Sequence, residues 1–336
     1  MEKAIVFGIG QIYKTCADMI RSKFDIVGLI DNDKNKQGQI IDGFKIESPE
    51  FLLKGNIAYD KILLIPQVKL TILNQLISLG ISMEKIDWCY FNGTICIPQK
   101  EFIHDKLVLR ENGVKLIIET DGDEILFEDT IIRKSYEVSL NDNSQYVVIN
   151  IGGNVGDTAL YFASFENIVK IYAYEPFKNT FNRALENLKL NQNLANKIEY
   201  HNFAIGNRNE ELFLDDVDSI GASIINPKKG TTKIIVRDVA EILNELFSKH
   251  NEEIFLELDC EGSEFEILSK LESENMLDKI SIIAMECHYM NINVPEKREF
   301  LKKLLKKNGF MFKLFHFRYG HDLLYAFNFK NEKLGE

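Results

Sequence analysis

A short apolar run that leads into a cluster of glycines constrains the fold of this chain more than any other stretch. The run covers residues 146–149, and Gly152, Gly153 and Gly156 follow it. Apolar residues then recur at helical spacing, at Leu160, Phe162, Ala163 and Phe165. This order predicts a buried parallel strand, a tight turn and a helix. Glycines in such a turn let a ligand approach the backbone, because no Cβ holds it off.

A second predicted strand ends in an acidic residue where an adenosine-binding site needs one. Residues 170–174 form this strand, and Glu175 follows, about 20 residues after the glycine turn. A carboxylate at this position can accept hydrogen bonds from both ribose hydroxyls of an adenosine. The unit therefore predicts either a nicotinamide dinucleotide site or an S-adenosylmethionine site.

Three details favour S-adenosylmethionine. The glycines are spaced Gly-Gly-x-x-Gly, and Ile151 occupies the position where a dinucleotide site has its first glycine. No Lys-Ser or Lys-Thr pair follows, as a phosphate-binding P-loop would require. Asn154 lies in the turn, where a pyrophosphate needs only bare backbone, whereas a carboxamide can contact an amino-acid group.

Five motifs in a fixed order resemble the FkbM-type family of S-adenosylmethionine-dependent methyltransferases, most of which methylate hydroxyls of sugars and natural products. They lie at residues 148–156, 174–177 with 188–191, 202–206, 255–264 and 286–288. The resemblance covers roughly residues 105–330. It implies an α/β fold with a Rossmann-like sheet of seven strands, in which the last hairpin is antiparallel. Two residues depart from the family pattern: Asn150 stands where Asp is usual, and Glu257 where Lys is common.

The resemblance also implies which residues bind the methyl donor, S-adenosylmethionine. They are Asn150, Gly152, Gly153, Asn154, Gly156, Glu175, Pro176, Phe177, Asn202 and Ala204. The product formed from this donor is S-adenosylhomocysteine. Asn202 and Ala204 are expected to flank the adenine.

Acidic residues and a histidine follow the fourth and fifth predicted strands, at residues 253–259 and 279–285. Ligands of an open α/β sheet bind at the carboxyl ends of its strands, so these side chains are expected at the same site. His288 is the first candidate for the general base, because an unperturbed imidazole titrates near pH 6.5. Asp259 and Glu261 are the second candidates. The alternatives are a structural role for His288 and a divalent metal on Asp259, Glu261 and Glu286, although no metal is expected.

Residues 1–88 predict a separate, smaller Rossmann-like domain, similar to N-terminal domains of bacterial sugar-modifying enzymes. A strand enters the turn Gly8-x-Gly10, and a second strand ends at Asp31. One interpretation is a nucleotide-sugar or substrate site at Gly8, Gly10 and Asp31. The other is a degenerate nucleotide fold that serves docking or homodimer formation.

Residues 89–145 predict a β-rich connector, with a hairpin that turns at Asp121-Gly122 and an acidic run, ending at Glu124, on the surface. The methyltransferase domain is expected at residues 146–330. Its candidate acceptor-binding residues are Ser223 and Lys228, in a long loop, and Arg318, in the turn of the closing hairpin.

Composition limits the classes of partner. The chain has 336 residues, enough for two domains, and a net charge of −11, which argues against a general nucleic-acid surface. It has no predicted leader and no apolar run long enough to enter a membrane, and its five cysteines form no disulfide-like array. These features predict a cytoplasmic protein that acts on a small molecule.

The expected function is S-adenosylmethionine-dependent O-methylation of a sugar hydroxyl, on a nucleotide-linked sugar or on a precursor of capsule or lipopolysaccharide. One alternative is an NAD-dependent sugar oxidoreductase that uses the N-terminal Gly-x-Gly turn, although the chain lacks a suitably placed Tyr-x-x-x-Lys dyad. Another is a non-enzymatic scaffold with two degenerate nucleotide folds.

Overall fold

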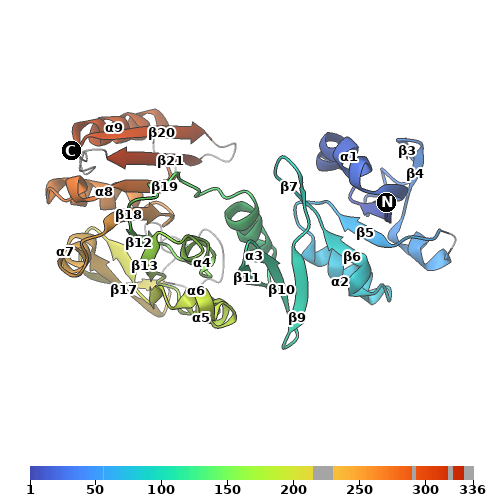
Figure 1. Ribbon diagram of the computed structural model, residues 1–336, viewed down its shortest axis with the longest axis horizontal. Helices are drawn as coiled ribbons and strands as arrows, with labels where there is room; N and C mark the ends of the chain where they lie inside the picture. The colour runs from blue at the N-terminus through green and yellow to red at the C-terminus, as the bar shows by residue number, and fades with distance from the viewer. Residues whose placement is uncertain (56, 215–229, 290–292, 317–320, 329–336) are drawn as a thin grey trace. The chain divides into compact units, whose positions relative to one another are not determined.

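The computed structural model describes residues 1–55, 57–214, 230–289, 293–316 and 321–328 (Figure 1). The chain divides into two compact units, Met1–Ser135 and Tyr136–Glu336. Most of the region expected as a separate connector, residues 89–145, is grouped with the first unit.

The first unit begins with a six-stranded sheet in the order β3-β4-β2-β1-β5-β6. Its strands are β1 Lys3–Phe7, β2 Asp25–Ile30, β3 Ile40–Ile41, β4 Phe44–Glu47, β5 Lys61–Leu64 and β6 Ile86–Trp88. Its helices are α1 Gln11–Lys23 and α2 Leu70–Ser78, with 3-10 turns at Pro49–Lys54 and Met83–Lys85. The central strand β1 runs parallel to β2 and β5, and its apolar side chains pack against buried residues of α1 such as Tyr13 and Ile20. This is the Rossmann-like arrangement that the sequence predicts.

The rest of the first unit is β-rich, but its turn does not lie at Asp121-Gly122. Strands β7 Tyr90–Phe91 and β8 Ile95–Cys96 pair, and β9 Gln99–Ile103, β10 Lys106–Glu111 and β11 Val114–Ile118 form an antiparallel sheet. A helix, α3 Asp121–Leu126, and a π-helical turn at Phe127–Ile132 follow. The expected hairpin at Asp121-Gly122 is wrong because Thr120 caps this helix: its hydroxyl accepts from the N–H of Asp123, and the Asp123 carboxylate accepts from the N–H of Thr120.

The expectation that this acidic run lies on the surface is also wrong for Asp123 and Glu124, which are both buried. The Glu124 side chain pairs with the equally buried ammonium of Lys69, at 3.2 Å. The indole N–H of Trp88 and the main-chain N–H of Lys69 donate to the same carboxylate. Buried charges require such partners, and these partners lie far from Glu124 in the sequence.

The second unit is built on a seven-stranded sheet in the order β14-β13-β12-β18-β19-β21-β20. The strands are β12 Tyr146–Ile151, β13 Ile168–Tyr174, β14 Ile198–His201, β18 Glu253–Leu258, β19 Ile282–His288, β20 Phe310–His316 and β21 His321–Asn328. The first five are parallel, and β21 is antiparallel to both β19 and β20. The predicted fold class, including the antiparallel closing hairpin, is confirmed.

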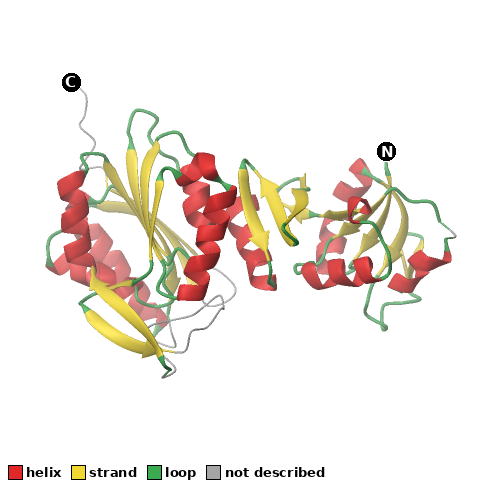
Figure 2. Cartoon of the chain, turned by 90° about the horizontal axis from the view of Figure 1, so that it is seen from below, coloured by secondary structure: helices red, strands yellow, loops and turns green. Residues whose placement is uncertain are grey.

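Helices lie on both faces of this sheet (Figure 2). They are α4 Asp157–Ala163, α5 Lys178–Leu190, α6 Gln192–Ala195, α7 Val239–Lys249, α8 Glu264–Ser273 and α9 Val294–Lys307, with a 3-10 turn at Leu277–Lys279. A small sheet contains β15 Ala204–Gly206, β16 Glu210–Leu214 and β17 Thr232–Asp238. Leu301, Leu304 and Leu305 bury one face of α9 in the core, as expected for a helix that docks on the sheet. None of the helices in the described part of the chain is long and apolar enough to cross a membrane.

Candidate active site

The glycine turn after β12 is held by close contacts at its first two glycines. Gly152 has a φ of +93°, and a Cβ built on it would lie 1.8 Å from the main-chain oxygen of Asp259. A Cβ on Gly153 would lie 2.3 Å from the hydroxyl of Tyr200. Glycine is therefore required at both positions, and the turn brings the carboxyl ends of β12 and β18 together. Gly156 then forms the N-cap of α4.

Glu175 lies at the end of β13 and faces the glycine turn. Its carboxylate accepts hydrogen bonds from the main-chain N–H of Asn154, at 3.1 Å, and of Phe177, at 2.8 Å. Only 6% of the residue is exposed. The carboxylate thus lies at the turn, where its expected binding to ribose hydroxyls stays a prediction.

Other residues that were expected to bind the methyl donor make contacts next to this region. Asn202 donates from its side chain to the main-chain oxygens of Glu175, at 2.9 Å, and Pro176, at 3.0 Å. Phe177 and Ala204 are buried in one small apolar cluster. Asn150 is fully buried, and its amide donates to Glu257 on β18.

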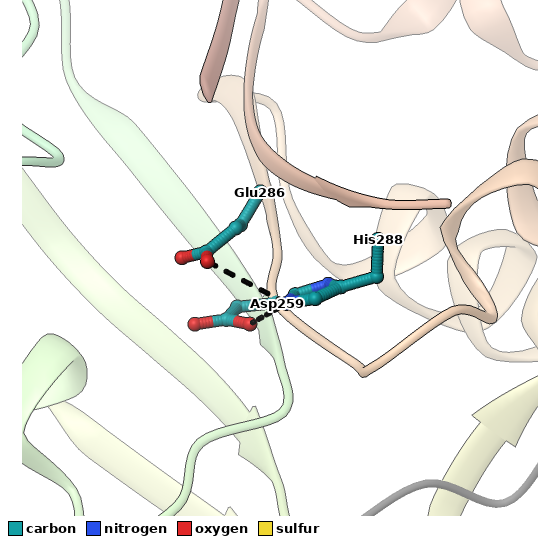
Figure 3. A group of neighbouring side chains, drawn as sticks. All are labelled: Asp259, Glu286 and His288. Atoms are coloured by element: carbon teal, nitrogen blue, oxygen red, sulfur yellow. Dashed lines mark ion pairs between the residues drawn. The ribbon is translucent and has the colours of Figure 1, made fainter. Parts of the chain in front are cut away.

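The three residues expected to be catalytic converge at the carboxyl edge of the sheet. Asp259 and Glu261 follow β18, and His288 ends β19. The Nε2 atom of His288 lies 3.9 Å from Asp259 Oδ1 and 3.5 Å from Glu261 Oε2. It also lies 3.5 Å from Glu286 Oε1, and Figure 3 shows Asp259, Glu286 and His288 pointing toward one another. The side chains of Asp259, Glu261, Glu286 and His288 are all partly exposed.

Two residues of this cluster were missed by the sequence analysis, Tyr136 and Glu264. The fully buried Glu264 accepts from Nδ1 of His288 at 2.9 Å, which directs Nε2 toward the other carboxylates. The Tyr136 hydroxyl lies 2.8 Å from Asp259 Oδ2 and 3.3 Å from Glu286 Oε2. Glu264 belongs to the motif at residues 255–264 and could have been singled out there. Tyr136 lies more than a hundred residues earlier, with no local motif to mark it.

The charges of this cluster change the role available to His288. Burial works against its charge, but hydrogen bonds with Glu264 and Glu286 and the charge of Asp259 outweigh burial and raise its pKa to about 11. His288 therefore carries a proton at neutral pH and has no lone pair with which to accept another. Burial and repulsion by Glu286 raise the pKa of Asp259, and burial raises the pKa of Glu261. These two carboxylates are the better proton acceptors.

The same side chains could hold a divalent cation. Asp259, Glu286 and His288 each offer one ligand atom, and these atoms all lie within 4.8 Å of one another. Two carboxylates and an imidazole suit Mn²⁺ or Zn²⁺ by donor type. A metal would have to displace the proton of His288, which already supplies a positive charge at this point.

Two of the three ligand candidates of the first unit, Gly8 and Asp31, make close contacts within that unit. A Cβ on Gly8 would lie 2.3 Å from Cγ of Pro66, so this glycine serves packing. The Asp31 carboxylate accepts from the N–H of Ile9 at 2.7 Å and pairs with Lys36 at 3.0 Å. Gly10 is the N-cap of α1, and a cavity of about 300 Å³ is lined in part by Gln11, Thr15, Lys69 and Arg133. The remaining substrate candidates, Ser223, Lys228 and Arg318, lie outside the described residues.

Comparison with family models assigns both parts of the chain. Residues 1–87 match the C2185-like N-terminal family, and residues 150–312 match the methyltransferase FkbM domain. No curated protein sequence is close enough to the chain to count as a match.

Solved structures of methyltransferases are also similar. A methyltransferase FkbM from Methylobacillus flagellatus KT is 11% identical, with a TM-score of 0.43 over 97% of this chain and 90% of that chain. A human methyltransferase 10 domain containing protein is 14% identical, with a TM-score of 0.35 over 57% of this chain and 76% of that chain. TrmK of M. capricolum, solved with S-adenosylhomocysteine, is 16% identical, with a TM-score of 0.30 over 56% and 64% of the two chains.

Proposed function

Because the chain is an S-adenosylmethionine-dependent methyltransferase with an FkbM domain behind a C2185-like N-terminal domain, we propose that it methylates a sugar hydroxyl. The acceptor is a nucleotide-linked sugar or a surface-glycan precursor. One observation carries the proposal: Asp259 touches the glycine turn with its main chain and enters the carboxylate cluster with its side chain. The glycine turn, which would bind the methyl donor, therefore lies next to the carboxylate cluster, which would bind the acceptor.

On the donor side, the protein has to hold and orient a methyl group that is already activated. The sulfonium of S-adenosylmethionine supplies this activation when the donor is bound. Glu175 would accept hydrogen bonds from the ribose hydroxyls, and the glycine turn would contact the amino-acid part. Fixing the acceptor oxygen in line with the methyl carbon then supplies much of the rate.

On the acceptor side, a cluster of carboxylates suits a polyol. Ionised carboxylates accept hydrogen bonds from hydroxyl groups, and they repel phosphate. The sugar would therefore enter the cluster with its hydroxyls, and any phosphate would lie away from it. The attacking oxygen forms a bond to the methyl carbon, the carbon–sulfur bond breaks, and the hydroxyl proton passes to Asp259. The protonated His288 fixes the carboxylates around this acceptor.

The proposal is tested by incubating the protein with S-adenosylmethionine and a panel of nucleotide sugars, followed by mass spectrometry. The expected result is one methylated sugar, together with an equal amount of S-adenosylhomocysteine. Matched deoxy-sugars, each lacking one hydroxyl, identify the position that is methylated. Methylation of amines or carboxylates in a parallel panel, with every sugar left unmodified, would contradict the proposal.

A further inference from the structure

The cavity of the first unit lies where an open α/β sheet binds its ligands. From β1 the chain moves to β2, β3 and β4 on one side, then returns to β5 and β6 on the other side. The strands β1, β5 and β6 are parallel. Such sheets bind ligands beyond the carboxyl ends of their strands, at the point where the strand order reverses, which is here between β1 and β5. The cavity of about 300 Å³ is lined by the start of α1 and by residues that follow β5 and β6.

The wall of this cavity includes a buried polar residue that needs a partner. Tyr90 lines the cavity and is 1% exposed, and its hydroxyl makes no hydrogen bond within the described part of the chain. Burial and the charges of Glu124 and Glu128 raise the pKa of Tyr90 well above its usual range, so the hydroxyl keeps its proton. Buried polar groups are nearly always hydrogen-bonded, and an oxygen atom of a ligand would supply the missing acceptor.

The start of α1 provides further donors at the same cavity. Gly10 is the N-cap of this 13-residue helix, no described side chain caps it, and its first turn contains no acidic residue. The first N–H groups of a helix have no partner inside the helix. Gln11 and Ile12, the first two residues of α1, line the cavity. Their N–H groups therefore border the space in which a ligand oxygen would lie.

The charges at the cavity are balanced, which favours an uncharged ligand. The buried ammonium of Lys69 is paired with Glu124 at 3.2 Å and lies 4.0 Å from the centre of the Tyr90 ring. The guanidinium of Arg133 is paired with Glu128 at 2.7 Å, and both residues line the cavity. A phosphate would be repelled by the Glu128 carboxylate and would compete with it for Arg133. Hydroxyl groups suit the same pair, because they donate to a carboxylate and accept from a guanidinium.

We propose that this cavity binds one uncharged sugar ring. Its volume lies at the lower end of the range for ligand pockets, so it suits a single ring better than an oligosaccharide. Gln11, Thr15 and Gln67 line it with amide and hydroxyl groups, which pair with sugar hydroxyls. Ile65 and Phe91 line it with apolar surface, against which the carbon atoms of a ring pack. This function goes beyond methyl transfer and does not depend on which acceptor the second unit methylates.

Binding is measured on the full chain by saturation-transfer NMR with a panel of neutral pyranoses. At least one pyranose should bind, and adenosine, an uncharged ligand with an aromatic base, should not. The 1-phosphate of the sugar that binds best should bind about tenfold more weakly or worse, because Glu128 repels it. The proposal is overturned if no pyranose binds, if adenosine binds in their place, or if the phosphate binds more tightly than the free sugar.

Tyr90→Phe removes only the hydroxyl that has no partner in the described chain. Sugar affinity should fall about threefold to tenfold, because one hydrogen bond to the ligand is lost. The urea midpoint of the sugar-free protein should not fall, because no internal hydrogen bond is lost. Unchanged sugar affinity, or unfolding at a lower urea concentration, would show that this hydroxyl does not serve a ligand.

Thr15→Trp tests whether the sugar binds in this cavity. Thr15 is exposed and lines the cavity, so a bulky side chain there narrows the space without removing a buried group. Sugar binding should be lost, while binding of S-adenosylhomocysteine stays within twofold of wild type. Thr71→Trp, at an exposed position of α2 outside the cavity lining, is the matched control and should bind the sugar as wild type does.

Asp259→Asn separates this site from the proposed acceptor site of the second unit. The variant should keep its affinity for the sugar, because all residues that line the cavity belong to Met1–Ser135. Sugar binding that is lost in Asp259→Asn and kept in Thr15→Trp would assign the sugar to the carboxylate cluster and overturn the proposal. If wild type binds the sugar but no S-adenosylhomocysteine, the methyltransferase assignment fails and the sugar site stands.

Discussion

The main-chain oxygen of Asp259 occupies the space that a side chain on residue 152 would need, 1.8 Å from the position of a Cβ on Gly152. This contact joins the glycine turn, which is the proposed site of the methyl donor, to the strand end that carries the candidate base. The ends of β12 and β18 touch here, with no side chain between them.

Gly152→Ala should therefore disrupt both folding and donor binding. The substitution adds a clash with a main-chain atom to the strain of a φ of +93°, so we expect a loss of about 3 kcal/mol or more in thermal unfolding. Gly38→Ala is the matched control: its φ is +85°, but nothing lies within 4 Å of the added Cβ. That variant should lose only about 1 kcal/mol. Equal losses in the two variants would show that the contact with Asp259 is unimportant.

His288→Gln should reduce turnover and leave donor affinity intact. The imidazole lies among Asp259, Glu261 and Glu286, on the acceptor side, and the variant removes the cation that fixes them. We expect kcat to fall about 10²- to 10⁴-fold, with binding of S-adenosylhomocysteine within twofold of wild type. His250→Gln, at a partly buried histidine bonded to Tyr172, is the control and should keep full activity. A selective loss of donor binding in His288→Gln would contradict this prediction, because it would place the histidine in the methyl-donor site.

The rate should depend on pH in a bell shape. The raised pKa of Asp259 means that it gains its active, ionised form as pH rises, so kcat increases on the acid side. His288 loses its proton near its pKa of about 11, so kcat falls at the alkaline end. Asp259→Asn should lower kcat about 10²- to 10⁴-fold and abolish the acid limb. An acid limb that persists in this variant would assign the base to another group, and Glu261→Gln would then be measured in the same way.

Removal of divalent metal should leave turnover unchanged. The proton on His288 supplies positive charge among the carboxylates where a metal would otherwise bind. The assay is repeated after dialysis against EDTA, with and without added Mg²⁺ or Mn²⁺. Activity that disappears with EDTA and returns with one of these ions would establish the metal site on Asp259, Glu286 and His288 instead.

The sequence predicted features that depend on local patterns. Apolar runs and glycines identified the strands and the turn at Gly152, and the motif order identified the sheet with its antiparallel hairpin. His288, Asp259 and Glu261 were brought together correctly because each follows a parallel strand of one sheet.

Features that depend on distant contacts could not be predicted in this way. Asp121-Gly122 looks like a hairpin turn, and only the reciprocal bonds of Thr120 and Asp123 make it a helix start. Glu124 looks like a surface acid until it meets Lys69. Likewise, an imidazole pKa of about 11 at His288 comes from carboxylates on other elements, so the sequence alone suggested an ordinary histidine base.

Calorimetric titration with S-adenosylhomocysteine, alongside NAD, tests the central claim most directly. Wild type should bind S-adenosylhomocysteine with micromolar affinity and NAD not at all. Glu175→Ala should weaken the first by about a hundredfold or more, because two hydrogen bonds to a charged acceptor are lost. Glu199→Gln, at an exposed acid on β14, should bind as wild type does. Binding of NAD in place of S-adenosylhomocysteine, or an affinity that Glu175→Ala leaves unchanged, would contradict the account.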